Sequence, residues 1–145
     1  MSRVLLVVSL ALSLVACFSM SPRADEWTFW KSDRAMREND VLRVMLECGH
    51  RMYADAYEYD EARRNPVSHM TYLGREVLTD RCMEKEGFRY TSEIGTTCKG
   101  GRYSRAYPEL PECQLPIEQI PSRDINKRLT SPYCTKFPTA ELCKP

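Results

Sequence analysis

The sequence predicts a small, loop-rich, mainly α protein in which two or three helices are joined by disulfides and followed by a proline-rich, irregular C-terminal part. Three observations lead to this prediction. Apolar residues recur at helical spacing in two stretches, 33–48 and 68–86. The chain has nine prolines, most of them beyond residue 107, and these limit regular structure there. Seven cysteines indicate disulfides that compensate for a modest core.

The chain opens with an apolar segment, 4–14, that follows Arg3 and is too short to span a bilayer. It closes on Leu14-Val15-Ala16-Cys17, which resembles the lipobox of bacterial lipoprotein precursors. In such precursors the cysteine receives a diacylglycerol and often an N-acyl chain. The resemblance implies that 1–16 is a signal peptide that is removed and that Cys17 is lipidated. The alternatives are an ordinary secretory signal and a bare membrane helix.

After Cys17 we expect a lipid-anchored tether over 17–26 and a single disulfide-containing domain over 27–145, with 114–145 as a possible C-terminal extension. Three aromatic residues open the domain. Trp27, Phe29 and Trp30 are expected to pack in the core or at its edge.

The first helix is predicted to start at Ser32 and Asp33, because a hydroxyl caps free amides and a carboxylate favours the positive end of the helix dipole. Gly49 is expected to end it. Two i,i+4 ion pairs are expected on its outer face, Asp33 with Arg37 and Arg34 with Glu38. Its apolar face would hold Ala35, Val41, Leu42, Met45, Leu46 and Cys48.

A short second helix is predicted over 52–64, where composition favours a helix that stops before Pro66. A third is predicted over 68–86 and ends at Gly87. A brief strand over 88–91 follows it. The core face of the third helix would hold Met70, Leu73, Val77, Leu78 and Cys82.

Beyond Cys98, regular structure is expected only as single turns. One is predicted over 122–129, with Asp124 and Arg128 as an i,i+4 pair. Thr139 is expected to cap a last turn that carries Cys143.

Composition and motifs argue against several classes of function. The 21 basic and 20 acidic residues nearly balance, so there is no electrostatic case for nucleic acid. Neither His50 nor His69 lies in a helical metal-binding spacing, and oxidised cysteines cannot ligate metal as thiolates. The carboxylates Asp55, Glu58, Asp60 and Glu61 fit a solvated helix face. We therefore expect no catalytic residue, no metal, and no cofactor besides covalent lipid.

Several short motifs occur in a particular order: Trp30-Lys31, Cys48-Gly49, Cys82-Met83 through Gly87-Phe88, and Pro108 through Cys113. Together with the lipobox, they resemble a group of small cysteine-containing envelope lipoproteins of Gram-negative bacteria. The resemblance covers residues 27–113. It implies an envelope lipoprotein without an assigned activity, and it implies pairing among the four cysteines Cys48, Cys82, Cys98 and Cys113.

Assigning Cys17 to lipid leaves six cysteines, which permit fifteen connectivities. Cys48 with Cys82 is favoured, because each lies at the C-terminal end of an apolar-faced helix. Cys98 with Cys113 and Cys134 with Cys143 are chosen from proximity in the sequence.

These inferences predict a non-catalytic structural or protein-binding module anchored by lipid in the bacterial cell envelope, where an envelope protein is its partner. Phe18 follows the cysteine where the familiar inner-membrane retention signal has aspartate, so the outer membrane is the expected location. The alternative is a surface-exposed lipoprotein that binds a host macromolecule through its tyrosine-rich or proline-rich segments.

Overall fold

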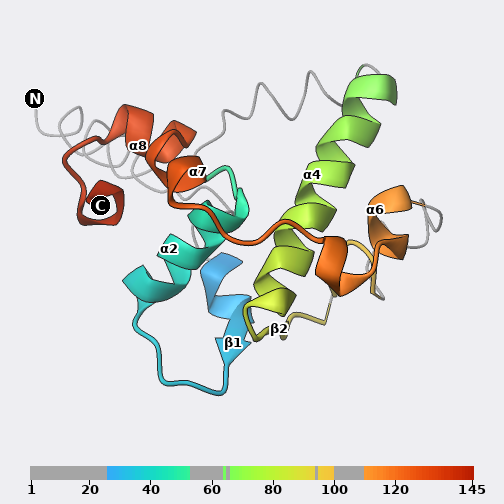
Figure 1. Ribbon diagram of the computed structural model, residues 1–145, viewed down its shortest axis with the longest axis horizontal. Helices are drawn as coiled ribbons and strands as arrows, with labels where there is room; N and C mark the ends of the chain where they lie inside the picture. Colours follow the sequence, from blue (N-terminus) through green and yellow to red (C-terminus); the bar gives the residue numbers. More distant parts are fainter. Residues whose placement is uncertain (1–25, 53–63, 65, 94, 100–109) are drawn as a thin grey trace, which may run out of the picture.

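The computed structural model describes residues 26–52, 64, 66–93, 95–99 and 110–145, without the side chains of 66–69. Two longer helices dominate it, α2 (Glu38–Cys48) and α4 (Pro66–Lys85) (Figure 1). A small sheet and a series of short helical turns complete it. The mainly α, loop-rich class predicted from the sequence is confirmed. Cys17, most of the predicted tether and most of the helix predicted over 52–64 lie outside the described residues.

The start of α2 differs from the prediction. The helix begins at Glu38, with Arg37 as its N-cap, and the carboxylate of Asp40 accepts hydrogen bonds from the backbone N–H and the Nε of Arg37. Asp33 instead pairs with Arg89 across the sheet, where Nη2 lies 2.6 Å from Oδ1. The predicted pairs of Asp33 with Arg37 and of Arg34 with Glu38 were wrong, because residues 33–37 precede the helix, and only inside a helix does an i,i+4 spacing bring side chains together.

The helix ends follow the glycines that the sequence indicated. Gly49 has φ of 105° and its N–H donates to the carbonyl of Leu46, while Gly87 after α4 has φ of 87°. Side chains disfavour this left-handed conformation, and glycine adopts it without a steric penalty. Both C-terminal boundaries are therefore encoded locally.

The strand predicted after α4 is present as β2 (Phe88–Tyr90) and pairs antiparallel with β1 (Trp30–Ser32). A short 3₁₀ turn, η2 (Glu26–Phe29), precedes β1. Trp30 is buried and packs edge-on against Tyr90, and Trp27 is partly buried against the same core. Phe29, the last residue of η2, also packs against Tyr90, with ring centroids 5.8 Å apart, but it lies at the edge of the core and is 40% exposed.

The main core lies between α2, α4 and the C-terminal part. On α2 the predicted face is confirmed from Val41 to Cys48, while Ala35 is exposed ahead of the helix. On α4, Leu73, Val77 and Cys82 are buried, but Met70 is 40% exposed one turn beyond the packed region. The described residues contain three disulfides, and these are the three predicted pairs: Cys48–Cys82, Cys98–Cys113 and Cys134–Cys143.

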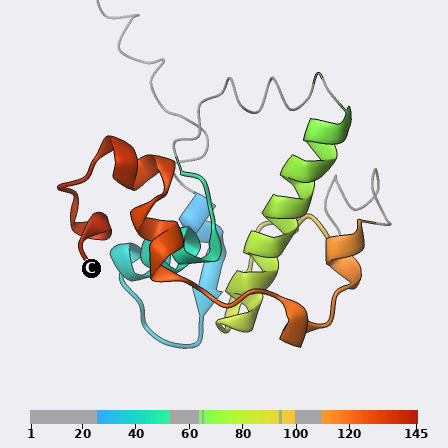
Figure 2. The ribbon, with the colours of Figure 1, turned by 45° about the horizontal axis from the view of Figure 1, so that its top comes forward.

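The C-terminal part consists of single turns, as expected from its prolines. These are α6 (Pro111–Gln114), η3 (Ile117–Gln119), α7 (Ile125–Leu129), α8 (Pro132–Lys136) and η4 (Glu141–Cys143). Figures 1 and 2 show α6 beside α4, whereas α7 and α8 lie on the α2 side. The segment between them crosses the molecule, and it buries Ile120 in the core.

Two predictions in this part were wrong. Arg128 does not pair with Asp124, whose carboxylate instead caps α7 by accepting the N–H of Asn126. The last turn has Ala140 rather than Thr139 as its N-cap. Within the described residues, no helix combines the length and the hydropathy needed to cross a bilayer.

Candidate functional site

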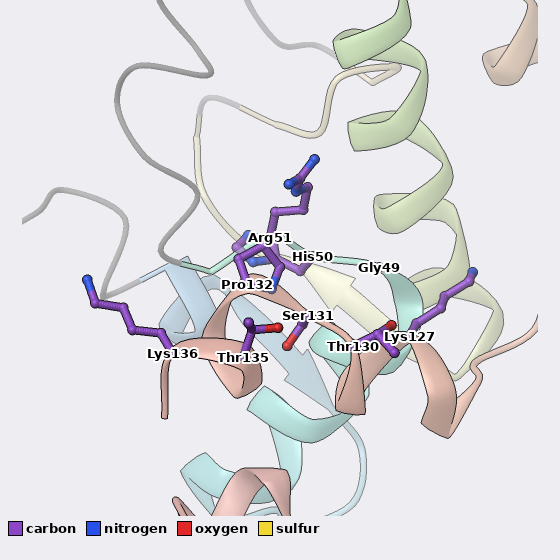
Figure 3. Close-up of a pocket in the computed structure, with 9 residues that line it drawn as sticks. All are labelled: Gly49, His50, Arg51, Lys127, Thr130, Ser131, Pro132, Thr135 and Lys136. Carbon is purple, nitrogen blue, oxygen red and sulfur yellow. The ribbon is translucent and has the colours of Figure 1, made fainter. Parts of the chain in front are cut away.

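A cavity of about 720 Å³ opens where the C-terminal end of α2 meets α7 and α8 (Figure 3). This volume is in the range of small-molecule sites. The residues after the α2 cap form one wall, and α7, α8 and the turn between them form the other. The lining residues are Gly49, His50, Arg51, Lys127, Thr130, Ser131, Pro132, Thr135 and Lys136.

A buried ion pair holds the two walls together. The carboxylate of Glu47, on the last turn of α2, accepts hydrogen bonds from Nε of Arg128 at 2.9 Å and from Nε of Arg123 at 2.7 Å. The backbone carbonyl of Glu47 also accepts the N–H of Asp124 at 3.0 Å. Glu47 and Arg128 are buried, so α7 is fixed to the end of α2 by charge as well as by packing.

The wall formed by α7 and α8 is held by a helix cap, a disulfide and hydrogen bonds to the C-terminal residues. Ser131 is the N-cap of α8, and its Oγ accepts the N–H of Cys134. Cys134 is bonded to Cys143, and Nη1 of Arg128 donates to the carbonyls of Leu142 and Lys144. The end of the chain therefore closes behind α8 and holds it in place.

Among the described residues, the charged side chains that line the cavity are basic. They are Arg51, Lys127 and Lys136, and the described lining includes no aspartate or glutamate. Within the described part of the chain, Lys127 and Lys136 form no ion pair, and Nζ of Lys136 lies 5.6 Å from the ring centroid of Phe137. In Figure 3 the two lysines stand on opposite sides of Ser131 and Thr135, and their ammonium groups point outward, away from these hydroxyls and from one another.

His50 belongs to the wall and is itself buried. Its Nε2 lies 3.0 Å from Oε2 of Glu26, and its buried Nδ1 has no hydrogen-bond partner among the residues that the structure describes. Burial by itself lowers the pKa of His50, but the hydrogen bond and charge of Glu26, with the charges of Glu76 and Asp80, raise that pKa above its ordinary value. The proton therefore stays on His50 to a higher pH than usual.

Asp80, on α4, is a carboxyl whose charge acts on His50. Burial raises the pKa of Asp80 to about 7, and the charges of Glu76 and Glu26 act in the same direction against the hydrogen bond from the backbone of Thr97. Burial with these same carboxylates also raises the pKa of Tyr90 to about 12.

The raised pKa of Asp80 predicts how stability depends on pH. From pH 3.8 to about 7 the unfolded chain gives up the Asp80 proton while the folded chain keeps it, so this group's stabilisation is lost as the pH rises through that window. Asp80→Asn is expected to flatten the fall in stability, because the amide is neutral at every pH. Urea unfolding across the window measures the slope. Asp33→Asn, at an exposed carboxylate, should keep the wild-type slope, and an unchanged slope for Asp80→Asn would contradict the assignment.

The candidate site residues named from the sequence lie in different parts of the structure. His50 lies in the cavity wall, while Cys48 is taken by its disulfide with Cys82. Among the described residues, no three histidine, cysteine or carboxylate side chains are grouped to hold a metal ion. Cys17, the tyrosine-rich segment and its carboxylates lie outside the described residues, as does the side chain of His69. Lys127, Thr130, Ser131 and Lys136 were not indicated, since no local motif links them to His50.

Comparisons of this chain with known protein families, with curated proteins and with solved structures find no match.

Proposed function

We propose that the protein is a lipid-anchored envelope lipoprotein whose folded domain is a non-catalytic binding module. Diacylglycerol and an N-acyl chain on Cys17 would hold the domain at the outer membrane, and an envelope protein would be its partner. The observation that carries the proposal is the pairing of cysteines. All six cysteines from Cys48 to Cys143 form disulfides with one another, so no other cysteine of the chain remains to pair with Cys17.

Two further observations support the proposal. Disulfides persist in oxidising compartments such as the periplasm. A cleavable lipoprotein signal would deliver the chain to that compartment. The thiol of Cys17 is also the group that lipid attachment needs, and two or three acyl chains make an essentially permanent anchor because each buried methylene contributes about 0.8 kcal/mol. The cavity between α2 and α8 gives the anchored domain a surface for binding.

Cys17→Ser is expected to abolish lipid attachment, since serine has no thiol to form the thioether. Cells fed radiolabelled palmitate should label the wild-type chain and leave the variant unlabelled, and the variant should leave the membrane fraction. Ser19→Ala, two residues away, is the matched control and should label normally. Equal labelling of wild type and Cys17→Ser would refute the anchor.

Protease treatment of intact cells tests which side of the outer membrane the domain faces. A periplasmic module should survive until the outer membrane is opened. Digestion in intact cells would instead favour the surface-exposed, host-binding alternative.

A further inference from the structure

His50 joins the end of α2 to the first turn of the domain. Its backbone N–H donates to the carbonyl of Met45 at 2.9 Å, which fixes the residue to the last turn of α2. Its Nε2 lies 3.0 Å from Oε2 of Glu26, the first residue of η2, and η2 lies beside α2 (Figure 1). The His50 side chain is only 9% exposed. A change of charge at this contact therefore has a larger effect than it would have in water.

The two ends of η2 are held by different contacts. At the C-terminal end, the carbonyl of Phe29 accepts hydrogen bonds from the N–H of Thr91 at 2.8 Å and from its hydroxyl at 2.9 Å. These bonds tie Phe29 to the residue after β2. At the N-terminal end, Glu26 contacts His50, and Trp27 beside it is only partly buried against the core. Loss of the contact between His50 and Glu26 is therefore expected to loosen residues 26–28 while β1 keeps its place.

Two buried groups at this contact change charge near neutral pH. Burial lowers the pKa of His50, but the hydrogen bond and charge of Glu26 raise that pKa above its ordinary value of 6.5. Burial raises the pKa of Asp80 to about 7. As the pH rises through these values, His50 loses its positive charge and Asp80 becomes negative. A neutral imidazole donates a weaker hydrogen bond to Glu26, and an ionised Asp80 repels the same carboxylate, so both changes weaken the hold on Glu26.

The other charged groups around this contact come from four further elements. Glu76 of α4 acts on the pKa of His50 and of Asp80 in the same direction as Glu26 does. Tyr90 of β2 has its pKa raised to about 12, so it stays neutral here. The cavity that His50 lines also contains Arg51, Lys127 of α7 and Lys136 of α8. We assign the pH response to His50 and Asp80, and the variants below separate their contributions.

We propose that the contact between His50 and Glu26 is a pH-sensitive closure, which holds η2 against the end of α2 in mild acid and releases residues 26–28 as the pH rises above neutrality. The tether predicted over 17–26 joins the domain at this turn. Release of these residues would lengthen the connection to the membrane by about 10 Å. That consequence rests on the proposed lipid anchor, whereas the closure itself is a property of the folded domain.

Tryptophan fluorescence tests the closure, because Trp27 in η2 and Trp30 in β1 are the only two tryptophans of the chain. The mature chain carrying Cys17→Ser is titrated with the neutral quencher acrylamide, at pH values from below 6.5 to above 7. We expect quenching to increase with pH, as the ratio of open to closed η2 rises about fivefold, the difference between a charged and a neutral hydrogen bond. Trp27→Phe should abolish the increase, because the remaining Trp30 is buried in β1.

Three variants identify the groups that titrate. His50→Gln keeps a hydrogen-bond donor that carries no charge, and Asp80→Asn removes the repulsion of Glu26. Each should reduce the rise in quenching, and the two together should flatten it. Glu118→Gln changes an exposed carboxylate on η3 and should keep the wild-type curve. Circular dichroism at each pH checks that the variants are folded.

The inference is overturned by quenching that does not depend on pH, by an increase that persists in Trp27→Phe, or by an unchanged increase in the combined His50→Gln and Asp80→Asn variant. The chain in this experiment carries no lipid, so its outcome is independent of the anchor. A palmitate-labelled wild type with a flat quenching curve for the unacylated chain overturns this inference alone. An unlabelled wild type with a pH-dependent curve overturns the anchor alone.

Discussion

Arg128→Met is expected to lower the free energy of unfolding by about 3–5 kcal/mol. The guanidinium of Arg128 is 3% exposed and donates to the carboxylate of Glu47, which is 6% exposed. Without it, the negative charge of Glu47 stays buried with only the partly exposed Arg123 as partner. The carbonyls of Leu142 and Lys144 lose a donor as well. Urea unfolding at neutral pH measures the change.

Two further variants distinguish the free-energy cost of breaking the ion pair between Arg128 and Glu47 from a general disruption of the fold. Arg123→Met removes the more exposed partner of the same carboxylate and should cost about 1 kcal/mol or less. Glu47→Leu combined with Arg128→Met removes both buried charges and should recover part of the stability lost in Arg128→Met. Equal losses in Arg123→Met and Arg128→Met would contradict the assigned role of Arg128.

Replacing Cys48 and Cys82 together by alanine is expected to cost about 4 kcal/mol. The two residues are 34 apart in the sequence, and the chain-entropy model gives this value for a loop of that size. Both cysteines are buried at the packed ends of α2 and α4, so the bridge also fixes the two helices against each other. For a domain of this size the loss is a large share of the total stability.

The disulfide between Cys134 and Cys143 serves as a comparison for the stability loss expected at Cys48 and Cys82. It closes a loop of only 9 residues, for which the same model gives about 2.5 kcal/mol. Thermal unfolding of the two double variants should therefore show the greater loss for Cys48 with Cys82. The reverse order would mean that local packing, rather than loop closure, dominates the effect of these bridges.

The features that could be predicted from the sequence are those set by neighbouring residues. Gly49 and Gly87 end their helices because the left-handed conformation is a property of one residue. The short turns beyond residue 110 follow from proline, which fixes its own backbone angle and cannot donate a hydrogen bond. Apolar spacing likewise located the buried faces of α2 and α4.

The missed features depend on residues that are distant in the sequence. Ser32 and Asp33 carry a valid local signal for a helix start, but pairing with residues 88–90 holds the chain extended. Arg128 has a well-spaced partner in Asp124, yet it pairs with Glu47, 81 residues away. The cavity depends on that same contact, because α7 and α8 reach the end of α2 only after the chain crosses the molecule. Local spacing therefore could not indicate Lys127 or Lys136 as neighbours of His50.

The three disulfides each join one cysteine of the folded region to the next in order, so their loops neither overlap nor enclose one another. A chain that is threaded across a membrane from its N-terminal side exposes its thiols in that same order. Each bridge can then close as soon as its second cysteine emerges, before a competing thiol is within reach. If the chain is exported as proposed, we therefore expect its native oxidation to require a thiol oxidant but no later reshuffling by an isomerase.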